Sequence, residues 1–367
     1  MSYLLLGFVA AAAGYQLVAL AAAFFHLLKR EPRGTALPPV SILKPVRGLD
    51  PHFYEAIRSH ALIDYPEYEI LFGVADPEDP AAAEIRRLQA EFPARRIELV
   101  HSTSPARNAK VGVLMDLAQH ARYPLLLVND GDIEVPADYL RRLVPPLEDT
   151  GVGVVTCLFR GASDHAPGCF EAIGIETNFM PSALVAPLVG VKEFGLGATL
   201  LFRAADLERI GGFAVLADYL ADDYQLARRL TGLGLRAHMA QVVVATHLSD
   251  DTWSSLWRHQ LRWARTIRLC RGGGYLGLPI THAGLWAAAA ALAGFPWAGL
   301  SLLALRLATA LVVGWGVLGS RITRRLFWLA PIWDIWAFFL WLAGLFGHMV
   351  LWRGARLRID RSGRIVG

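Results

Sequence analysis

Cysteine is scarce in this chain: its 367 residues include three, Cys157, Cys169 and Cys270. Their number is odd and their spacing is wide, so they match neither a disulfide framework nor a zinc site, and they fit a reducing cytoplasm. The chain also lacks internal repeats and the mixture of basic and aromatic residues that is typical of nucleic-acid binding. No nucleic-acid partner is therefore expected.

Charge is missing from the first membrane-length segment. Apolar residues make up 54% of the chain, which is too apolar for an ordinary soluble protein. Residues 3–28 hold no acidic or basic residue except His26, and they are long enough to cross a bilayer. No positive region precedes them and no convincing cleavage site follows, which favours a retained anchor over a signal peptide. Lys29, Arg30 and Arg33 then place the following domain in the cytoplasm by the positive-inside rule.

The C-terminal region contains three more apolar stretches, at about 283–300, 302–319 and 326–351, interrupted by Pro296, Arg306, Pro331 and Asp334. Three crossings would put the C-terminal tail outside the cell. That tail is rich in arginine, which favours the inside; it carries Arg353, Arg356, Arg358, Arg361 and Arg364. The conflict suggests that one stretch is re-entrant or interfacial, and the one with Pro331 and Asp334 is the best candidate.

Residues 40–247 have the composition of a globular α/β domain. Strands are expected at 40–46, 69–74, 97–100 and 125–128, with helices at 51–60, 80–92 and 109–120 between them. This alternation predicts a parallel sheet. The rhythm then changes, with strands expected at 152–158, 198–202 and 241–245, a helix at 222–230, and a basic amphipathic helix at 253–269 that leads into the membrane region.

The stretch Asn129-Asp130-Gly131-Asp132 directly follows the apolar run 125–128. Two carboxylates therefore lie at the carboxyl end of a buried strand, where open α/β sheets bind their ligands. Their spacing can hold one hard divalent cation, Mn²⁺ or Mg²⁺, and such a cation suits a diphosphate. The alternative is a solvated acidic turn, since aspartate is a common turn residue.

Other polar groups follow predicted elements. Asp76 ends the second strand and can bind a nucleotide base or ribose, or can cap the turn at 77–80. Asn108 and Lys110 begin a helix, where amides and a lysine suit phosphate, although a solvated lysine is the alternative. Asp222 and Asp223 begin another helix, as caps or as a general base whose pKa its neighbour raises.

The basic helix before the membrane carries His259, Arg262 and Trp263. The planar fork of Arg262 can hold a diphosphate, and Trp263 can pack over an acceptor or anchor the helix at the interface. For Arg258, Arg265 and Arg268 we expect snorkelling cations at the bilayer surface instead.

These pieces together resemble the ceramide glucosyltransferase family, a set of membrane-bound inverting glycosyltransferases. The resemblance runs from about 40 to 268, with weaker echoes at both membrane ends. It is carried by 40–51 (VSILKPVRGLDP), Asp64-Tyr65-Pro66, 76–80 (DPEDP), Gly211-Gly212-Phe213, Asp222-Asp223-Tyr224, Arg262-Trp263 and Trp352-Arg353-Gly354.

The resemblance implies a Rossmann-like GT-A domain and a role for each site residue. Asp76 corresponds to the nucleotide site, Asp130 and Asp132 to the metal and diphosphate site, and Asp223, with Asp222 beside it, to the catalytic base. Arg262 and Trp263 match the end of the closing motif. His259 stands where the family has Gln or Arg, so the charge at that position becomes pH-dependent. The implied reaction is direct displacement of UDP from a UDP-sugar by a lipid hydroxyl, with Lys110 and Arg262 stabilising the departing UDP.

The resemblance also implies an organisation along the chain. We expect a membrane anchor over 1–30, a cytoplasmic catalytic domain over 38–250 and an interfacial helix with the closing motif over 251–280. Membrane helices over 281–352 and a basic tail over 353–367 follow. The protein is thus expected to be an integral membrane protein, with the bilayer and a lipid acceptor as partners.

Two acceptors fit the resemblance. The family name points to ceramide and UDP-glucose. The segments 259–266 and 50–55 also resemble a bacterial, hopanoid-associated branch that adds N-acetylglucosamine to bacteriohopanetetrol, and we favour that branch, in a bacterial inner membrane. Competing classes are a processive polysaccharide synthase, which needs more membrane helices, a transporter, for which Arg306 and Asp334 are candidate intramembrane groups, and a non-catalytic nucleotide-sugar-binding scaffold.

Overall fold

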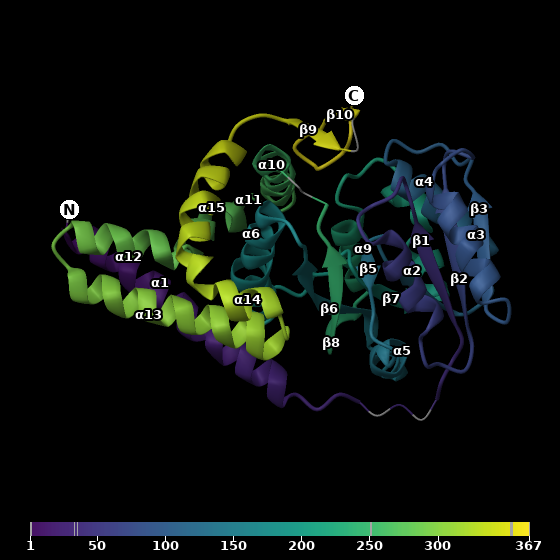
Figure 1. The fold of residues 1–367 in the computed structure, drawn as a ribbon, viewed down its shortest axis with the longest axis horizontal. Helices are drawn as coiled ribbons and strands as arrows, with labels where there is room; N and C mark the ends of the chain where they lie inside the picture. Colours follow the sequence, from purple (N-terminus) through teal and green to yellow (C-terminus); the bar gives the residue numbers. More distant parts are fainter. Residues whose placement is uncertain (1, 33, 35, 250–251, 353–354, 367) are drawn as a thin grey trace. The chain divides into compact units, whose positions relative to one another are not determined.

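The computed structural model describes residues 2–32, 34, 36–249, 252–352 and 355–366, and the chain divides into two compact units. Residues 30–159 and 192–247 form one, which we call the sheet unit; residues 1–29, 160–191 and 248–367 form the other, the helical unit. Figure 1 shows their elements coloured along the chain. Arg33, Arg353 and Gly354, used above for topology and for the family's tail motif, lie outside the described residues.

The first half of the sheet unit alternates strands and helices, as predicted. Its elements are β1 (Val40–Pro45), α2 (Phe53–Ala61), β2 (Tyr68–Val74), α3 (Ala81–Glu91), β3 (Arg96–His101), α4 (Ala109–His120) and β4 (Leu125–Val128). β1 pairs in parallel with β2 and β4, and β2 pairs in parallel with β3. β4 is buried along its whole length, which explains why it is an uninterrupted apolar run.

The second half turns the sheet into a mixed one. Its elements are β5 (Ile133–Glu134), α5 (Tyr139–Leu143), η1 (Pro145–Glu148), β6 (Val152–Ala162), β7 (Leu200–Arg203), α8 (Ala204–Arg209), η3 (Phe213–Leu216), α9 (Asp222–Gly232) and β8 (Arg236–His247). β7 runs antiparallel to β4, and the strand order is β3-β2-β1-β4-β7-β6-β8-β5. This is the expected α/β fold. Sequence reasoning missed β5, α5 and α8, because segments this short carry little periodicity.

Strand register brings the predicted site segments to one edge of the sheet. Leu43 of β1 lies level with Leu71 of β2 and with Val128 of β4. The parallel strands β2 and β4 therefore end at the same edge, and Asp76 and Asp130 follow those ends. Behind this edge, α4 and α9 share one buried cluster with the strands, with Leu114, Leu117, Phe202 and Leu226 among its members. This packing fixes the two helix N-termini against the sheet.

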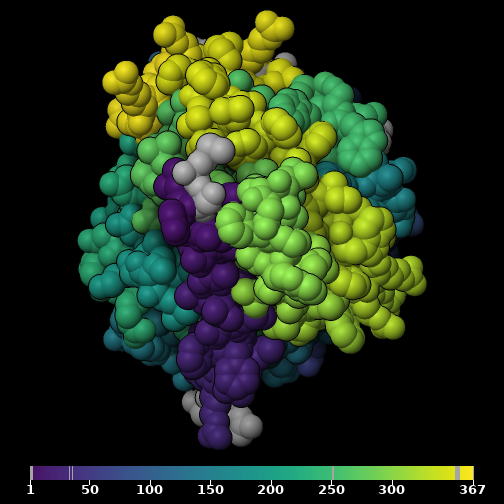
Figure 2. Space-filling model, turned by 90° about the vertical axis from the view of Figure 1, so that its left-hand side faces the viewer, coloured from purple at the N-terminus to yellow at the C-terminus, as the bar shows by residue number. Residues whose placement is uncertain are grey.

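The helical unit consists mainly of helices from three parts of the chain. Its elements are α1 (Ser2–Leu28), α6 (Ala166–Gly174), η2 (Ile175–Phe179), α7 (Met180–Val185), α10 (Trp253–Cys270), α11 (Gly272–Gly277), η4 (Leu278–Thr281), α12 (Ala283–Leu292), α13 (Pro296–Ala310), η5 (Leu311–Val317), α14 (Arg321–Leu326), η6 (Phe327–Leu329), α15 (Ala330–Gly344) and the hairpin of β9 (Met349–Trp352) and β10 (Ala355–Arg358). In Figures 1 and 2, α1 lies alongside α12 and α13. Val9 and Ala12 of α1 pack there with Ala283, Ala287 and Leu302.

Three helical segments among the described residues are long and apolar enough to cross a bilayer: Tyr3–Leu28, Pro296–Val317 and Arg321–Gly344. A fourth candidate is the pair Gly272–Thr281 and Ala283–Leu292, which bends by 52°. A sharp bend in the C-terminal region therefore lies directly before α12. Pro331 lies in the first turn of α15, where its missing N–H removes no helical hydrogen bond.

The two charged interruptions of the apolar stretches pair with each other. Arg306 of α13 and Asp334 of α15 are both fully buried and form a bidentate pair, with Nε–Oδ2 at 2.8 Å and Nη2–Oδ1 at 2.9 Å. Arg306 also donates to the carbonyl of Thr177, and Asp334 accepts from the N–H of Gly284. Because both charges are satisfied by protein groups, these residues support a structural role rather than a transport pathway.

Two cations on α10 have a different role from the one expected. Arg265 donates to the carbonyls of Phe346 and Met349, and Arg268 donates to those of Leu345 and Gly347. These carbonyls follow the C-terminal end of α15, where helices leave acceptors unpaired and favour positive charge. The expectation of snorkelling side chains was therefore wrong for Arg265 and Arg268.

We predict that the protein tolerates replacement of both members of the buried pair but not of either member alone. Arg306→Met or Asp334→Leu alone leaves one buried charge without its partner, which costs about 3–5 kcal/mol. The double variant removes both charges and should recover most of that loss. Thermal unfolding of the purified protein in detergent, followed by tryptophan fluorescence, measures this; single variants as stable as the parent would contradict the assigned role.

Candidate functional site

The site in the sheet unit is built on the end of β4. Asn129, the first residue after the strand, is fully buried, and its side-chain amide donates to the carbonyl of Ala198 at 2.6 Å and to the hydroxyl of Tyr139 at 3.0 Å. The amide thus fixes the strand end against the segment that leads into β7. The next residues, 130–132, leave the sheet from a rigid base.

Lys110 joins the predicted acidic segments. Its ammonium lies 2.7 Å from Oδ1 of Asp130 and 3.2 Å from Oδ2 of Asp222, although these two acids are far apart along the chain. Burial alone would lower the pKa of Lys110, but Asp130, Asp222 and Asp223 outweigh it and raise that pKa above the ordinary value. Lys110 is therefore a permanent cation between two acidic segments, and the alternative of a solvated lysine is wrong.

Asn108 holds the two helix N-termini together. As the N-cap of α4, its Oδ1 accepts from the N–H groups of Lys110 and Val111. Its Nδ2 donates to the carbonyl of Tyr219 at 2.8 Å and to Oδ1 of Asp222 at 3.4 Å. The asparagine thereby satisfies the first turn of α4 and links it to the loop before α9.

Asp223 begins α9 beside this cluster. Its Oδ1 accepts from the N–H of Tyr224 at 2.7 Å. Burial and the charge of Asp222 raise the pKa of Asp223 to about 6, while Lys110 acts in the opposite direction. A Cβ on Gly197 would lie 2.9 Å from Oδ2 of Asp223, so a side chain at position 197 would displace this carboxylate from its present position. Sequence reasoning missed Gly197, because nothing local distinguishes it from an ordinary loop glycine.

Asp132 is the more buried member of the Asp-x-Asp pair. Burial and the charge of Asp130 raise the pKa of Asp132 to about 6, and a hydrogen bond from Thr246 of β8 partly offsets this rise. No cluster of three or more His, Cys, Asp or Glu side chains suited to a metal occurs among the described residues. Two crowded carboxylates nevertheless fit Mg²⁺ or Mn²⁺, which complete their shell with phosphate oxygens and water.

The buried Lys44 contacts the backbone of the Asp130–Asp132 pair. Lys44 of β1 is inaccessible to solvent, and its ammonium donates to the carbonyl of Asp130 at 2.9 Å and to Nε2 of His60 at 3.3 Å. The His60 ring is neutral, with Nδ1 donating to Ala56, because burial and the Lys44 charge keep the pKa of His60 well below its ordinary value. Burial lowers the pKa of Lys44 to about 7. Sequence reasoning quoted Lys44 in the family segment but assigned it no role.

Asp76 takes part in a turn at the same sheet edge. Its Oδ1 accepts from the N–H of Glu78, and its side chain is exposed. β1 lies between β2 and β4, so the two strand ends are about 10 Å apart. The buried Asp79 accepts from Gly48 and Ala81 and so ties the loop after β1 to the start of α3. The structure thus places Asp76 at the same edge of the sheet as Asp130. Among the described residues, it shows no contact between Asp76 and the Lys110 cluster.

His259, Arg262 and Trp263 lie on α10 in the helical unit. Nδ1 of His259 lies 2.9 Å from Oε1 of Glu171, a fully buried carboxylate of α6 that also accepts from Gln260 at 2.6 Å. The His259 and Trp263 rings meet edge to face, and Trp263 packs on Phe179. Glu171 therefore orients His259; sequence reasoning missed it because α6 carries no recognisable motif.

The sequence is similar to proteins of one described family. The model of the family described as Glycosyl transferase family 21 matches residues 4–365. Ceramide glucosyltransferase 1 of Caenorhabditis elegans is 27% identical over 251 residues, which cover 66% of this chain and 53% of that protein. Ceramide glucosyltransferase 3 of the same organism is 26% identical over 257 residues, 68% of this chain and 55% of that protein. The chain spans about half the length of these relatives.

The fold also has a counterpart of known structure. Mannosyltransferase PcManGT from Pyrobaculum calidifontis, solved in complex with GDP-Man and Mn²⁺, superposes with a TM-score of 0.58 at 21% identity, covering 94% of this chain and 97% of that one. The likeness confirms the expected GT-A fold. Since the family model spans nearly the whole sequence, the chain belongs to glycosyl transferase family 21.

Proposed function

We propose that this protein transfers a sugar from a UDP-sugar to a hydroxyl group of a membrane lipid, with inversion at the anomeric carbon. The observation that carries the proposal is the Lys110 cluster, where one partly buried cation brings Asp130 and Asp222 together at the ligand-binding edge of the sheet. The family match and the apolar helices of the helical unit support the lipid as acceptor class.

Asp223 is proposed as the general base. A base works best when its pKa is near the working pH, and burial together with Asp222 brings Asp223 to about 6. The acceptor hydroxyl would give its proton to this carboxylate as its oxygen attacks the anomeric carbon from the face opposite UDP. The carboxylate of Asp222, held by Asn108 and Lys110, lies beside it and contributes to the raised pKa of Asp223.

The departing UDP needs positive charge, and several residues are proposed to supply it. Asp130 and Asp132 would hold a divalent cation, Mn²⁺ or Mg²⁺, which when bound neutralises charge on the diphosphate. Lys110 would contribute a second, fixed positive charge at the N-terminus of α4, next to the amides capped by Asn108. In the proposal, Arg262 and His259 also bind the diphosphate, Trp263 packs beside it, and Asp76 binds the nucleoside.

Two donor–acceptor pairs are candidates within this class. The sequence resemblance favours N-acetylglucosamine transfer to bacteriohopanetetrol, in a bacterial inner membrane. The names of the curated relatives favour glucose transfer to ceramide. Assaying one preparation with both acceptors and both UDP-sugars separates the pairs, and the mass of the product distinguishes a single transfer from a processive synthase. UDP release that depends on added lipid would exclude a non-catalytic nucleotide-sugar-binding scaffold.

Replacing the base or the metal ligand should abolish transfer without unfolding the protein. We expect Asp223→Asn and Asp132→Ala each to lower kcat/KM by on the order of 10²–10³ or more. The measurement is transfer from a radiolabelled UDP-sugar by purified variants of unchanged thermal stability. Asp64→Asn, at an exposed surface pair with Arg141, is the matched control and should retain activity. Near-normal turnover by Asp223→Asn would refute its role as base.

The pH profile should report the ionisation of the base. Because only the carboxylate form of Asp223 accepts a proton, kcat/KM should fall as the pH drops through about 6. Asp222→Asn removes a charge that raises this pKa, so the acidic limb should move to lower pH. Lys110→Met removes a charge that lowers it, so the limb should move to higher pH. Profiles normalised to their own maxima test this, and shifts in the same direction for both variants are incompatible with it.

A further inference from the structure

The α14–α15 segment presents a continuous apolar stripe to its surroundings. Its exposed members are Trp328, Ile332, Ile335, Phe339, Leu342 and Phe346, between 39% and 68% exposed. Their spacing of three and four residues places them on one face of a helix. The opposite face is buried in the helical unit through Ala330, Trp333, Asp334 and Leu340. The segment is therefore attached on one side and apolar but uncovered on the other.

Both ends of this segment are tied to elements that stay with the catalytic domain. At its start, the carbonyl of Leu318 accepts from Arg160 of β6, and Thr323 bonds to Glu176, which in turn accepts from the N–H of Gly161 in β6. β6 is a strand of the main sheet. The carbonyl of Leu318, just before α14, is thus bonded to the end of β6, and α14 itself is linked to that strand end through Glu176.

At its far end, the segment is tied to α10. The four carbonyl contacts made by Arg265 and Arg268 hold residues 345–349 against that helix. Only residues 248–252 separate β8 from α10, and six extended chain steps span about 22 Å at most. Because the hydrocarbon core is about 30 Å thick, α10 begins on the same side of the membrane as β8. Since α10 is not among the described helices that are apolar enough to cross a bilayer, Arg265 and Arg268 lie on that side as well.

A crossing helix would place its two ends on opposite sides. Arg321–Gly344 has 24 residues, which makes about 36 Å of helix, yet both of its ends are bonded to groups on the catalytic side. In Figure 1, α15 also runs across the direction of α1, α12 and α13 rather than alongside them. The helices α12 and α13 form a tight hairpin turning at 293–295, where Gly294 has φ +89°. Such a hairpin enters and leaves the bilayer on one side.

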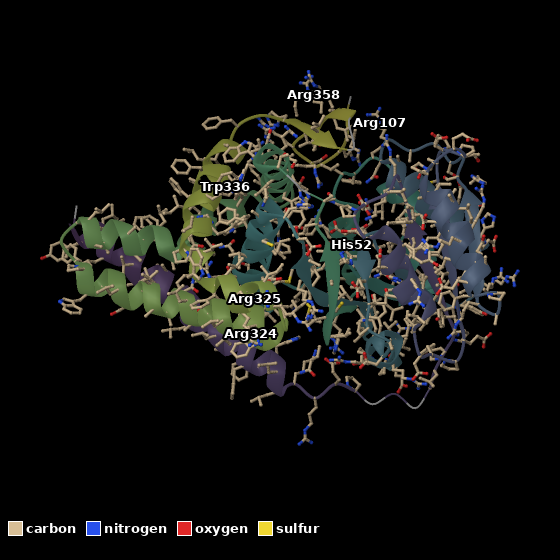
Figure 3. All side chains as sticks on the ribbon, in the orientation of Figure 1. His52, Arg107, Arg324, Arg325, Trp336 and Arg358 are labelled. Carbon is tan, nitrogen blue, oxygen red and sulfur yellow. The ribbon has the colours of Figure 1, made fainter. Side chains whose placement is uncertain are left out.

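Charge follows the same pattern. Arg321, Arg324 and Arg325 are exposed at the start of the segment, and the exposed Arg356 and Arg358 follow its end, as the labelled side chains of Figure 3 illustrate. Basic residues at both ends contradict the positive-inside rule for a spanning helix. They suit a helix that lies along a surface with anionic lipid headgroups.

We infer that α14–α15 does not cross the membrane but lies in the plane of the bilayer, on the side of the catalytic domain, with its apolar stripe in the boundary between headgroups and acyl chains. The occupant of the stripe is lipid. The C-terminal tail then lies on the catalytic side, which resolves the conflict between three apolar stretches and an arginine-rich tail. This inference holds whichever sugar is transferred.

Depth along the segment tests the inference directly. Ile332→Cys, Phe339→Cys and Phe346→Cys, each in the full chain with Cys169 and Cys270 replaced by serine, carry an environment-sensitive fluorophore in vesicles of phosphatidylcholine and phosphatidylglycerol. Residues 332 and 344 are about 18 Å apart along α15, and Phe346 follows two residues after its end. Quenching by lipids brominated at different acyl positions should give all three labels the same shallow depth.

Two results would overturn the inference. A deep label at position 339 between two shallow labels would establish that the segment crosses the membrane. Labels that are not quenched, in a protein that cross-links as a dimer, would show that a second copy of the chain covers the stripe.

Sidedness provides an independent test. In the same background, Ser362→Cys in the tail and Ala90→Cys on α3 of the sheet unit are exposed and are labelled with a membrane-impermeant maleimide in sealed, oriented vesicles. The two positions should label from the same side. Labelling from opposite sides would show an odd number of crossings and overturn the inference.

Discussion

The ion pairs made by Lys110 are the constraint on which the site depends. Asp130 follows β4 and Asp222 begins α9, and two carboxylates at such close quarters repel each other unless a cation lies between them. The ammonium removes that repulsion and fixes the distance between the proposed phosphate-binding edge of the sheet and the proposed base. The other contacts elaborate this arrangement: Asn108 locks the two helix starts, Lys44 supports the carbonyl of Asp130, and Gly197 leaves room for Asp223.

The sequence was informative where a signal is local. The run 125–128 predicted β4 because a strand buried on both faces needs uninterrupted apolar residues. The acids directly after this run are therefore placed at the end of the strand. The alternation of strands and helices predicted the parallel part of the sheet, because a helix between two strands connects them in parallel. Family motifs then separated Asp223 from other helix-starting acids, which no periodicity could have done.

Contacts between distant segments were out of reach of sequence reasoning. Nothing near Lys44 indicates that its side chain is buried beneath Asp130, and nothing near Glu171 indicates that it binds His259. Arg306 and Asp334 were interpreted separately, as interruptions of two apolar stretches, whereas in the structure they form an ion pair with each other. Arg265 and Arg268 were interpreted from composition alone, and composition cannot reveal that the carbonyls after α15 are within their reach.

The hairpin of α12 and α13 has a consequence for how the protein is made. From Ala283 to Leu305 the chain holds no ionisable side chain, so inserting the tip of this hairpin carries no charge into hydrocarbon. Its entry is driven by apolar transfer alone, at roughly 25 cal/mol for each Å² removed from water. Of the arginines that flank it, Arg271 and Arg321 are exposed and can stay in water at the base of the hairpin, whereas Arg306 is fully buried and is neutralised by Asp334.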